Sequence, residues 1–304
     1  MTDQITRAAD FDDSQIALLD QAFLIASTDA IVIDQFVDYK KEIGAASIAM
    51  DKYPKMSRAT TALTDGTDVD RTRLTDTKVT LTPEEYGAVV GVTTLANLQT
   101  GGKAPIATAA VVAQNMVETM NAVGIIAGEA GTNIRLANGA ASEGAIVAGD
   151  IIQPRDLDYV HNKLTRANIQ FFEGENYIAL AHPDVISDIK LMPEFVAAAK
   201  YASAIQLMRN EVGIWKGFRW VSTTGVTVNT DAGAGTVDSY HTQFFGHNAL
   251  GRADSKVPGL TITGPFDMLG RVINLGWYGV VDYGILDQNA HWIITSASSF
   301  GTNT

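Results

Sequence analysis

The histidines are the residues of this chain with the clearest potential for chemistry. None of the five occurs in an HxH, HxxxH or HExxH pattern, the spacings typical of metal sites; they are His161, His182, His241, His247 and His291. His182 precedes a proline where a helix is expected to begin, which favours a turn or capping role. His241 and His247 flank an apolar run, so a metal shared between them is a minor alternative. We expect no metal and no cofactor.

Two short motifs match parts of enzyme sites but lack the accompanying residues. Ser187 and Lys190 fit the SxxK pattern of acyl-transfer enzymes, but the SDN and KTG motifs that belong with it are missing. Lys103 follows two glycines as in a phosphate-binding loop, yet Ala104 stands where such a loop needs Ser or Thr. No set of residues supplies a nucleophile, a base and an orienting group together. The sequence therefore does not predict an enzyme.

Composition narrows the class of protein further. The 304 residues are 46% apolar and 18% charged, which indicates an ordered protein with one large or two medium domains. A net charge of −12 argues against a protein whose main task is to grip nucleic-acid phosphates. The absence of cysteine excludes disulfides, thiolate catalysis and cysteine-ligated metals.

Neither the N-terminus nor the longest apolar segment indicates a membrane protein. The first 13 residues, MTDQITRAADFDD, are polar and acidic, unlike a signal peptide. Residues 106–126 are apolar enough to be considered as a span, but they include Gln114, Asn115, Glu118 and Asn121, which are costly against lipid. We expect a soluble chain, made in the cytosol, with no membrane contact.

Two segments before residue 84 have too little apolar surface to fold alone. In the first, residues 14–39, Ile16, Leu19 and Phe23 follow helical spacing, and we expect this arm to lie along another surface. The second, residues 60–82, contains nine threonines, and its large apolar side chains are Leu63, Val69, Leu74, Val79 and Leu81.

The threonine-rich segment favours extended structure, with a turn at Asp65-Gly66. The 39-residue stretch from 44 to 82 cannot form a core of its own, so it is either disordered or a projecting hairpin that gains stability from a neighbour. The alternation of Val79 and Leu81 on one arm favours the hairpin. An exposed hairpin with free edges favours association with other chains.

The remaining sequence predicts a mixed α+β protein. Residues 84–98 have the pattern of a strand, and residues 104–127 predict a helical rod of roughly 30 Å. After Gln153-Pro154, helices and strands alternate, which describes a compact unit. From Leu260 the pattern returns to β-structure, and these terminal strands are expected to pair with the segment before residue 150. The compact unit would then be an insertion into a discontinuous domain.

Three stretches of sequence, in this order and spacing, point to a known family. They are residues 62–66 (ALTDG) with 79–82 (VTLT) and 86–87 (YG); residues 177–183 (YIALAHP) with 209–213 (RNEVG) and 217–221 (GFRWV); and residues 264–271 (GPFDMLGR) with 276–280 (GWYGV) and 292–295 (WIIT). Together they span most of the chain from about residue 40. The chain resembles the major capsid proteins of tailed bacteriophages, which share the Hong Kong 97-like capsid fold.

The resemblance implies an α+β fold made of four parts. These are an N-terminal arm (1–42), an extended β-hairpin loop (43–83), a peripheral domain (84–152 and 255–304) with a spine helix at about 104–127, and an axial α/β domain (153–254).

The resemblance also implies a function: a major capsid protein that self-assembles as hexamers and pentamers into the icosahedral shell around the double-stranded DNA genome of a tailed phage. Its location would be the virion capsid, assembled in the bacterial host cytoplasm. Expected partners are further copies of the chain, scaffolding and portal proteins, a decoration protein, and packaged DNA contacted non-specifically at the inner face.

Inter-subunit contacts are expected from the arm and the loop. The residues predicted to make them are Phe23, Phe36, Leu63, Asp65, Val69, Leu74 and Val79. Two alternatives stay open: the shell of an encapsulin-like bacterial nanocompartment, and a soluble α/β enzyme.

Overall fold

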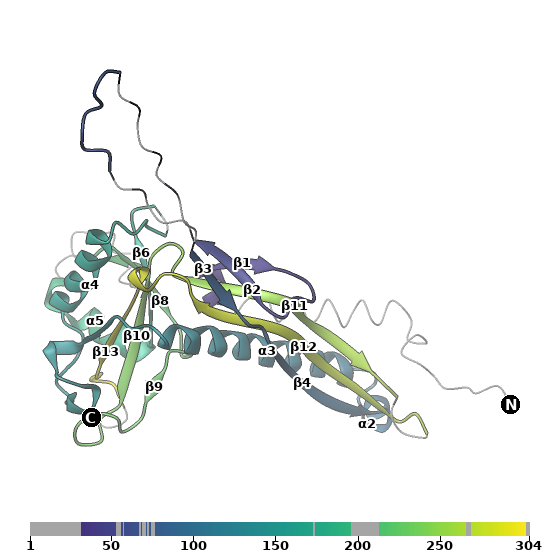
Figure 1. Ribbon diagram of the computed structural model, residues 1–304. Coiled ribbons are helices and arrows are strands. Elements are labelled where there is room, and N and C mark those ends of the chain that lie inside the picture. The colour runs from purple at the N-terminus through teal and green to yellow at the C-terminus, as the bar shows by residue number, and fades with distance from the viewer. Residues whose placement is uncertain are drawn as a thin grey trace.

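In the computed structural model of the chain, a compact body and an elongated sheet are joined along one long helix (Figure 1). The α+β class is confirmed. The structure describes residues 32–52, 56, 58–66, 68, 71, 73, 77–172, 174–195, 213–265 and 269–301.

The compact body is built on a seven-stranded mixed sheet in the order β5-β13-β10-β6-β8-β7, with β9 paired to β10. Every residue of the central strand β6 is buried, because helices and loops cover both faces of the sheet. The elements are β5 (Ile134–Leu136), α4 (Pro154–Arg166), β6 (Tyr177–Ala181), α5 (Pro183–Leu191), β7 (Ile214–Trp215), β8 (Phe218–Ser222), β9 (Val228–Asn229), β10 (Ser239–Phe245) and β13 (His291–Ser296).

The elongated sheet has four strands in the order β1-β11-β12-β4. They are β1 (Val37–Lys41), β11 (Leu250–Thr263), β12 (Val272–Ile285) and β4 (Glu84–Thr93). The short helix α2 (Thr94–Gln99) follows β4 at the far end of the sheet, and a 3-10 turn, η2 (Ile33–Phe36), precedes β1. β11 and β12 are long enough to run from the compact body to this far end (Figure 1).

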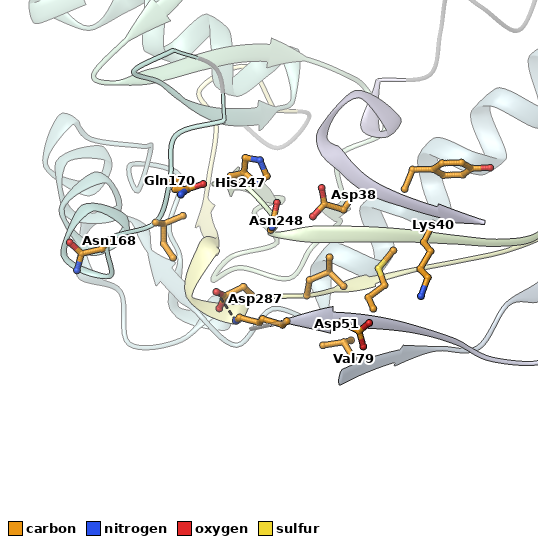
Figure 2. Close-up of a pocket in the computed structure, with 14 residues that line it drawn as sticks. Asp38, Lys40, Asp51, Val79, Asn168, Gln170, His247, Asn248 and Asp287 are labelled. Atoms are coloured by element: carbon orange, nitrogen blue, oxygen red, sulfur yellow. Dashed lines mark ion pairs between the residues drawn. The ribbon is translucent and has the colours of Figure 1, made fainter. Parts of the chain in front are cut away.

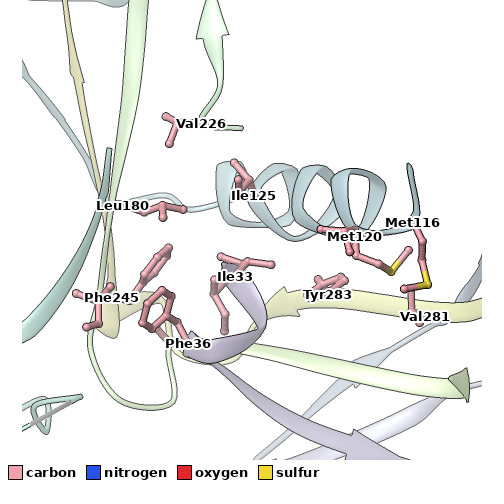
Figure 3. Close-up of a cluster of buried hydrophobic side chains, with 14 of the residues drawn as sticks. Ile33, Phe36, Met116, Met120, Ile125, Leu180, Val226, Phe245, Val281 and Tyr283 are labelled. Carbon is pink, nitrogen blue, oxygen red and sulfur yellow. The ribbon is translucent and has the colours of Figure 1, made fainter. Parts of the chain in front are cut away.

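Helix α3 (Ala104–Glu129) lies along one face of the elongated sheet and reaches the compact body with its C-terminal end (Figure 1). Its start has Pro105 in the first turn, as the sequence predicts. One continuous core joins Met116, Met120 and Ile125 of the helix to side chains of both sheets (Figure 3). The long helix expected from the sequence is confirmed, and it ends two residues later than expected.

Polar side chains of α3 bind other parts of the chain, which is typical of a core helix rather than of a membrane span. Among the described residues, it is the one helix long and apolar enough to cross a membrane, and 44% of its most apolar stretch is buried inside the chain. Asn115 Oδ1 accepts a hydrogen bond from Trp277 Nε1 (2.9 Å), and Asn121 Oδ1 accepts one from the Val32 amide (3.0 Å). These side chains connect the helix to β12 and to the turn before β1.

The predicted hairpin is present as a two-stranded sheet of β2 (Ile48–Lys52) and β3 (Thr77–Leu81). Its inner side packs on the four-stranded sheet, with Met50 beside Gly251 and Leu81 beside Gly284. The described residues between the two strands include the expected turn at Asp65-Gly66, where Gly66 has a φ of 77°. This part of the chain projects away from the body (Figure 1).

The structure departs from the predicted division at two strands. Residues 292–295 were expected to close the peripheral domain; β13 does pair with β5, from the segment before residue 150, but it also pairs with β10 of the predicted axial domain, in the seven-stranded sheet. Conversely, the first residues of β11, from Leu250 to Asp254, were expected in the axial domain and lie in the four-stranded sheet. The reason is that β11 crosses between the two bodies in one uninterrupted strand, and the chain returns to the compact body after β12.

The close fit of α3 against the compact body makes a prediction for Gly128. A Cβ at this position would lie 2.9 Å from Cδ of Gln243, whose side chain is fully buried. Gly128→Ala should therefore lower the free energy of unfolding by about 1–3 kcal/mol, although alanine favours a helix by about 1 kcal/mol. Urea denaturation measures this. Gly149→Ala, where a Cβ meets open space, should be nearly neutral; stabilisation by Gly128→Ala would contradict the close fit.

Candidate assembly site

The predicted contact residues of the arm and loop lie in three different environments. Leu63 is 76% exposed and Asp65 is exposed in the projecting turn. Val79 is half-buried on β3, where it packs against the cluster of Ile48 and Met50 beneath the hairpin. Phe23, Val69 and Leu74 lie outside the described residues.

Phe36 is wrongly assigned to an inter-subunit contact. It is only 4% exposed and belongs to the core shared by α3 and both sheets. Its ring meets Phe172 edge-on, with centroids 5.6 Å apart. A side chain already enclosed by its own chain offers no surface to a neighbour, so Phe36 anchors the segment before β1 to the body.

A buried ionic cluster holds the same segment in place. The Arg252 guanidinium on β11 contacts both carboxylate oxygens of Asp254, at 2.8 and 3.0 Å, and also pairs with Asp34. The Tyr283 hydroxyl donates to Asp34 at 2.7 Å, and burial together with this carboxylate raises the pKa of Tyr283. Because the arginine is permanently charged and its partners are carboxylates, the cluster fixes geometry and offers no reacting group.

A second polar cluster lies where α3 meets the compact body. His241 on β10 stands between two carboxylates, with Nδ1 hydrogen-bonded to Glu129 at the end of α3 and Nε2 hydrogen-bonded to Glu143 at 3.0 Å. Burial lowers the pKa of His241, but the hydrogen bonds and charges of the two carboxylates outweigh it, so the net pKa is raised. The carboxylates approach opposite ring nitrogens, so they do not converge on a point where a metal could bind.

His291 on β13, next to this cluster, has the opposite character. Burial lowers its pKa to about 4, and neither ring nitrogen has a hydrogen-bond partner within the described part of the chain. Its ring packs beside Phe245, with centroids 5.3 Å apart. It is therefore a neutral core residue at pH 7.

The residues singled out for chemistry in the sequence serve the fold. His182 caps α5, accepting the Asp184 amide proton at Nδ1 (3.3 Å), as the sequence predicts. Ser187 donates to the Pro183 carbonyl within α5 (2.9 Å), a bond made by many helical serines. No group of three potential metal ligands occurs among the residues that the structure describes.

A groove of about 670 Å³ separates the base of the hairpin from the compact body (Figure 2). One wall is formed by β1 and β2, including Asp38, and the other by two loops, which carry Gln170 and His247. The Lys52–Asp287 ion pair, at 2.6 Å, belongs to the lining (Figure 2). The lining mixes acidic, basic and amide groups without a convergent set that could bind or activate one ligand group.

Exposed apolar side chains gather on the elongated sheet and the connections at its far end. The sequence analysis missed them, although the glycine-rich apolar pattern of β4 was the signal available. Val89 is 65% exposed, and its neighbours of the same kind are Val90, Leu95, Leu98 and Leu269. Exposed apolar side chains at the end of a sheet make this region a candidate for contacts with other chains.

Known proteins resemble this chain in three-dimensional structure, but none was matched by sequence. No protein-family model matches the chain, and no curated protein sequence matches it. Among solved structures, the capsid of Ralstonia phage GP4 superimposes with a TM-score of 0.68 at 12% identity, covering 88% of each chain. The cyanophage Pam1 capsid gives 0.67 at 12% identity, covering 87% of this chain and 89% of that one.

A third structure has the same fold in a different particle. The virus-like particle from Pyrococcus furiosus superimposes with a TM-score of 0.53 at 13% identity, covering 91% of this chain and 97% of that one. At these identities the likeness establishes the fold: the chain has the Hong Kong 97-like capsid fold over nearly its full length.

The lowered pKa of His291 predicts how the stability of the fold depends on pH. The unfolded chain binds a proton at His291 near pH 6.5, whereas the folded chain binds it only near pH 4. Stability should therefore fall as pH falls between these values, by up to about 1.4 kcal/mol per pH unit from this residue. His291→Phe should flatten the fall, as measured by urea denaturation of the unassembled subunit at several pH values.

The matched control for this measurement is Ile189→Val. It removes a buried methyl group from the other core cluster, away from His291, so it should lower stability about equally at every pH and leave the slope unchanged. An unaltered slope in His291→Phe would show that other groups produce the acid sensitivity.

Proposed function

We propose that this chain is the major capsid protein of a tailed phage, which self-assembles as hexamers and pentamers into an icosahedral shell around double-stranded DNA. The observation that carries the proposal is the fold-wide likeness to phage capsids, at TM-scores up to 0.68 over 88% of the chain. The proposed location is the virion capsid, assembled in the cytoplasm of the bacterial host.

The surfaces that the fold leaves uncovered support the same proposal. The loop residues around Leu63 project from the body and touch no core, and the far end of the sheet exposes apolar side chains such as Val89 and Leu98. A monomeric protein gains nothing from such surfaces, whereas a shell subunit buries them against its neighbours. No described constellation of side chains supports catalysis, so we propose no enzymatic activity.

Further partners belong to the proposal as well. We propose that separate scaffolding and portal proteins direct assembly, that a decoration protein can bind outside, and that packaged DNA meets the inner wall without sequence preference. The net charge of −12 fits this last point, because an acidic wall limits adhesion of DNA.

The alternative is an encapsulin-like compartment, because a particle described only as virus-like, from Pyrococcus furiosus, has the same fold. Phage capsids give TM-scores from 0.54 to 0.68, a range that begins beside the 0.53 of the virus-like particle. The phage proposal is favoured by the higher scores, from 0.64 to 0.68, which come from phage capsids. The content of purified particles separates the two: phage heads from infected cells contain nuclease-protected DNA, whereas a compartment contains protein cargo.

The size of the purified protein tests the proposal directly. Light scattering and negative-stain microscopy of the chain, expressed with its scaffolding protein where one is required, should show capsomers or closed shells. A stable monomer under all these conditions would contradict the proposal.

Leu63→Asp gives a residue-level version of the test. Because Leu63 is 76% exposed, the substitution should change the free energy of unfolding by less than about 0.5 kcal/mol. A carboxylate buried against a neighbouring subunit is costly, so the yield of shells in sucrose gradients should fall sharply. Leu63→Met keeps the apolar contact and should assemble normally; normal shells from Leu63→Asp would show that Leu63 makes no contact.

A further inference from the structure

The far half of the four-stranded sheet has two open edges. β1 pairs with β11 only between Leu250 and Asp254, so the outer edge of β11 after Asp254 has no strand partner among the described residues. On the opposite side, β4 is the last strand of the sheet and pairs only with β12 in the same described set. Unpaired N–H and C=O groups along such edges readily accept another strand.

The two edges have the same direction and matching length. β4 and β11 both run antiparallel to β12, so they are parallel to each other. Gly259 of β11 and Gly87 of β4 face the same residue of β12, Tyr278. Four residues further on, Thr263 and Gly91 both face Asn274. If a second copy is displaced by the width of the sheet, residues 87–91 of the second copy therefore lie beside residues 259–263 of the first.

The point where β1 ends fits this arrangement. Lys41, the last residue of β1, lies opposite Asp254, which is level with Glu84 at the start of β4. The segment after β1 continues along the same edge, where the Glu42 and Gly44 amides donate to the carbonyls of Asp254 and Ser255, at 3.0 and 3.3 Å. An incoming β4 would occupy the edge of β11 beyond this point. Pro258 has no N–H, and the ladder of β11 is irregular between Lys256 and Gly259, which limits the new pairing to residues 259–263.

Charges at the two edges are complementary. Glu85 on β4 and Lys256 on β11 both lie level with Val280 of β12. Tyr278 lies between them: its hydroxyl hydrogen-bonds to Glu85, and the Lys256 ammonium stands 4.2 Å from its ring centroid. The row of residues Glu85, Val280 and Lys256 across the sheet is therefore acidic at the β4 edge and basic at the β11 edge. In a side-by-side arrangement, Glu85 of one copy meets Lys256 of the next.

We propose that β4 of one copy pairs with the free end of β11 in a second copy, so that neighbouring subunits share one continuous sheet. The occupant is a second copy because direction, length and charge all match within this chain. The contact uses different surfaces on the two copies, so it propagates head to tail and can close into rings. This inference rests on the proposed function and specifies one of its subunit contacts.

A pair of cysteines tests the contact cleanly, because the chain has none of its own. Val89 and Thr261 are exposed and both face Gly276 of β12. Within one chain they are two strand spacings apart, roughly 10 Å, which is too far for a disulfide. Across the proposed contact they are direct neighbours. Oxidised assemblies of Val89→Cys/Thr261→Cys should give a ladder of covalent multimers on a non-reducing gel.

Three controls define the outcome of the cysteine experiment. Each single variant should give no ladder, and Val89→Cys/Lys256→Cys, which is out of register by roughly 13 Å, should give none either. Shells without a ladder in the matched pair would overturn the inference and leave the proposed function standing. A ladder in the mismatched pair instead would overturn the register, and failure to assemble at all would count against both.

Charge reversal provides a second, independent measurement. Glu85→Lys places two lysines at the contact and Lys256→Glu places two glutamates there, so each variant alone should weaken the contact roughly fivefold. Mixing the two variants restores opposite charges between alternate copies and should restore capsomer formation by light scattering. In the mixture each chain still carries its own substitution, so contacts within a chain are not restored. Recovery of capsomers would therefore report the contact between copies. A mixture no better than either variant would overturn the inference.

Discussion

The packing of helix α3 against both sheets is the interaction on which the rest of the structure depends. The four-stranded sheet buries Trp277, Val281 and Tyr283 against the helix. The C-terminal end of the same helix reaches the seven-stranded sheet, where Gly128 allows close approach to Gln243. Without α3, the elongated sheet would expose its apolar face to water, at a cost of roughly 1.5–3 kcal/mol for each large side chain. The helix therefore sets the distance between the two bodies.

Buried charge is concentrated where segments distant in sequence meet. Arg252 connects β11 to Asp34 before β1, and His241 connects β10 to Glu129 at the end of α3. Buried ion pairs contribute little net stability because desolvation offsets their attraction, but leaving one partner unpaired is expensive. Such clusters thus favour one arrangement of the segments over alternatives of similar apolar packing. In this chain they fix the position of the segment before β1 and the position of the C-terminal end of α3.

The same construction explains which surfaces the described residues leave uncovered. α3 covers one face of the elongated sheet only, and β1 covers only the first part of the β11 edge. The hairpin of β2 and β3 packs by its inner side and leaves the projecting turn at Asp65-Gly66 exposed. The described part of the chain thus has a complete core while strand edges and apolar side chains at the far end stay exposed, which is the property that the proposed shell subunit requires.

Local sequence patterns determined several elements of this protein: the helix at 104–129, the cap at His182 and the extended segment that ends in β3 follow from periodicity, proline and turn residues. Only the tertiary structure decided that β13 joins β10, that Phe36 is enclosed and that Val89 lies on an open edge. Strand pairing joins residues far apart in sequence, and an apolar strand has the same pattern whichever sheet it enters. Periodicity reports that a side chain needs an apolar partner, but whether its own chain supplies one depends on packing across the whole fold.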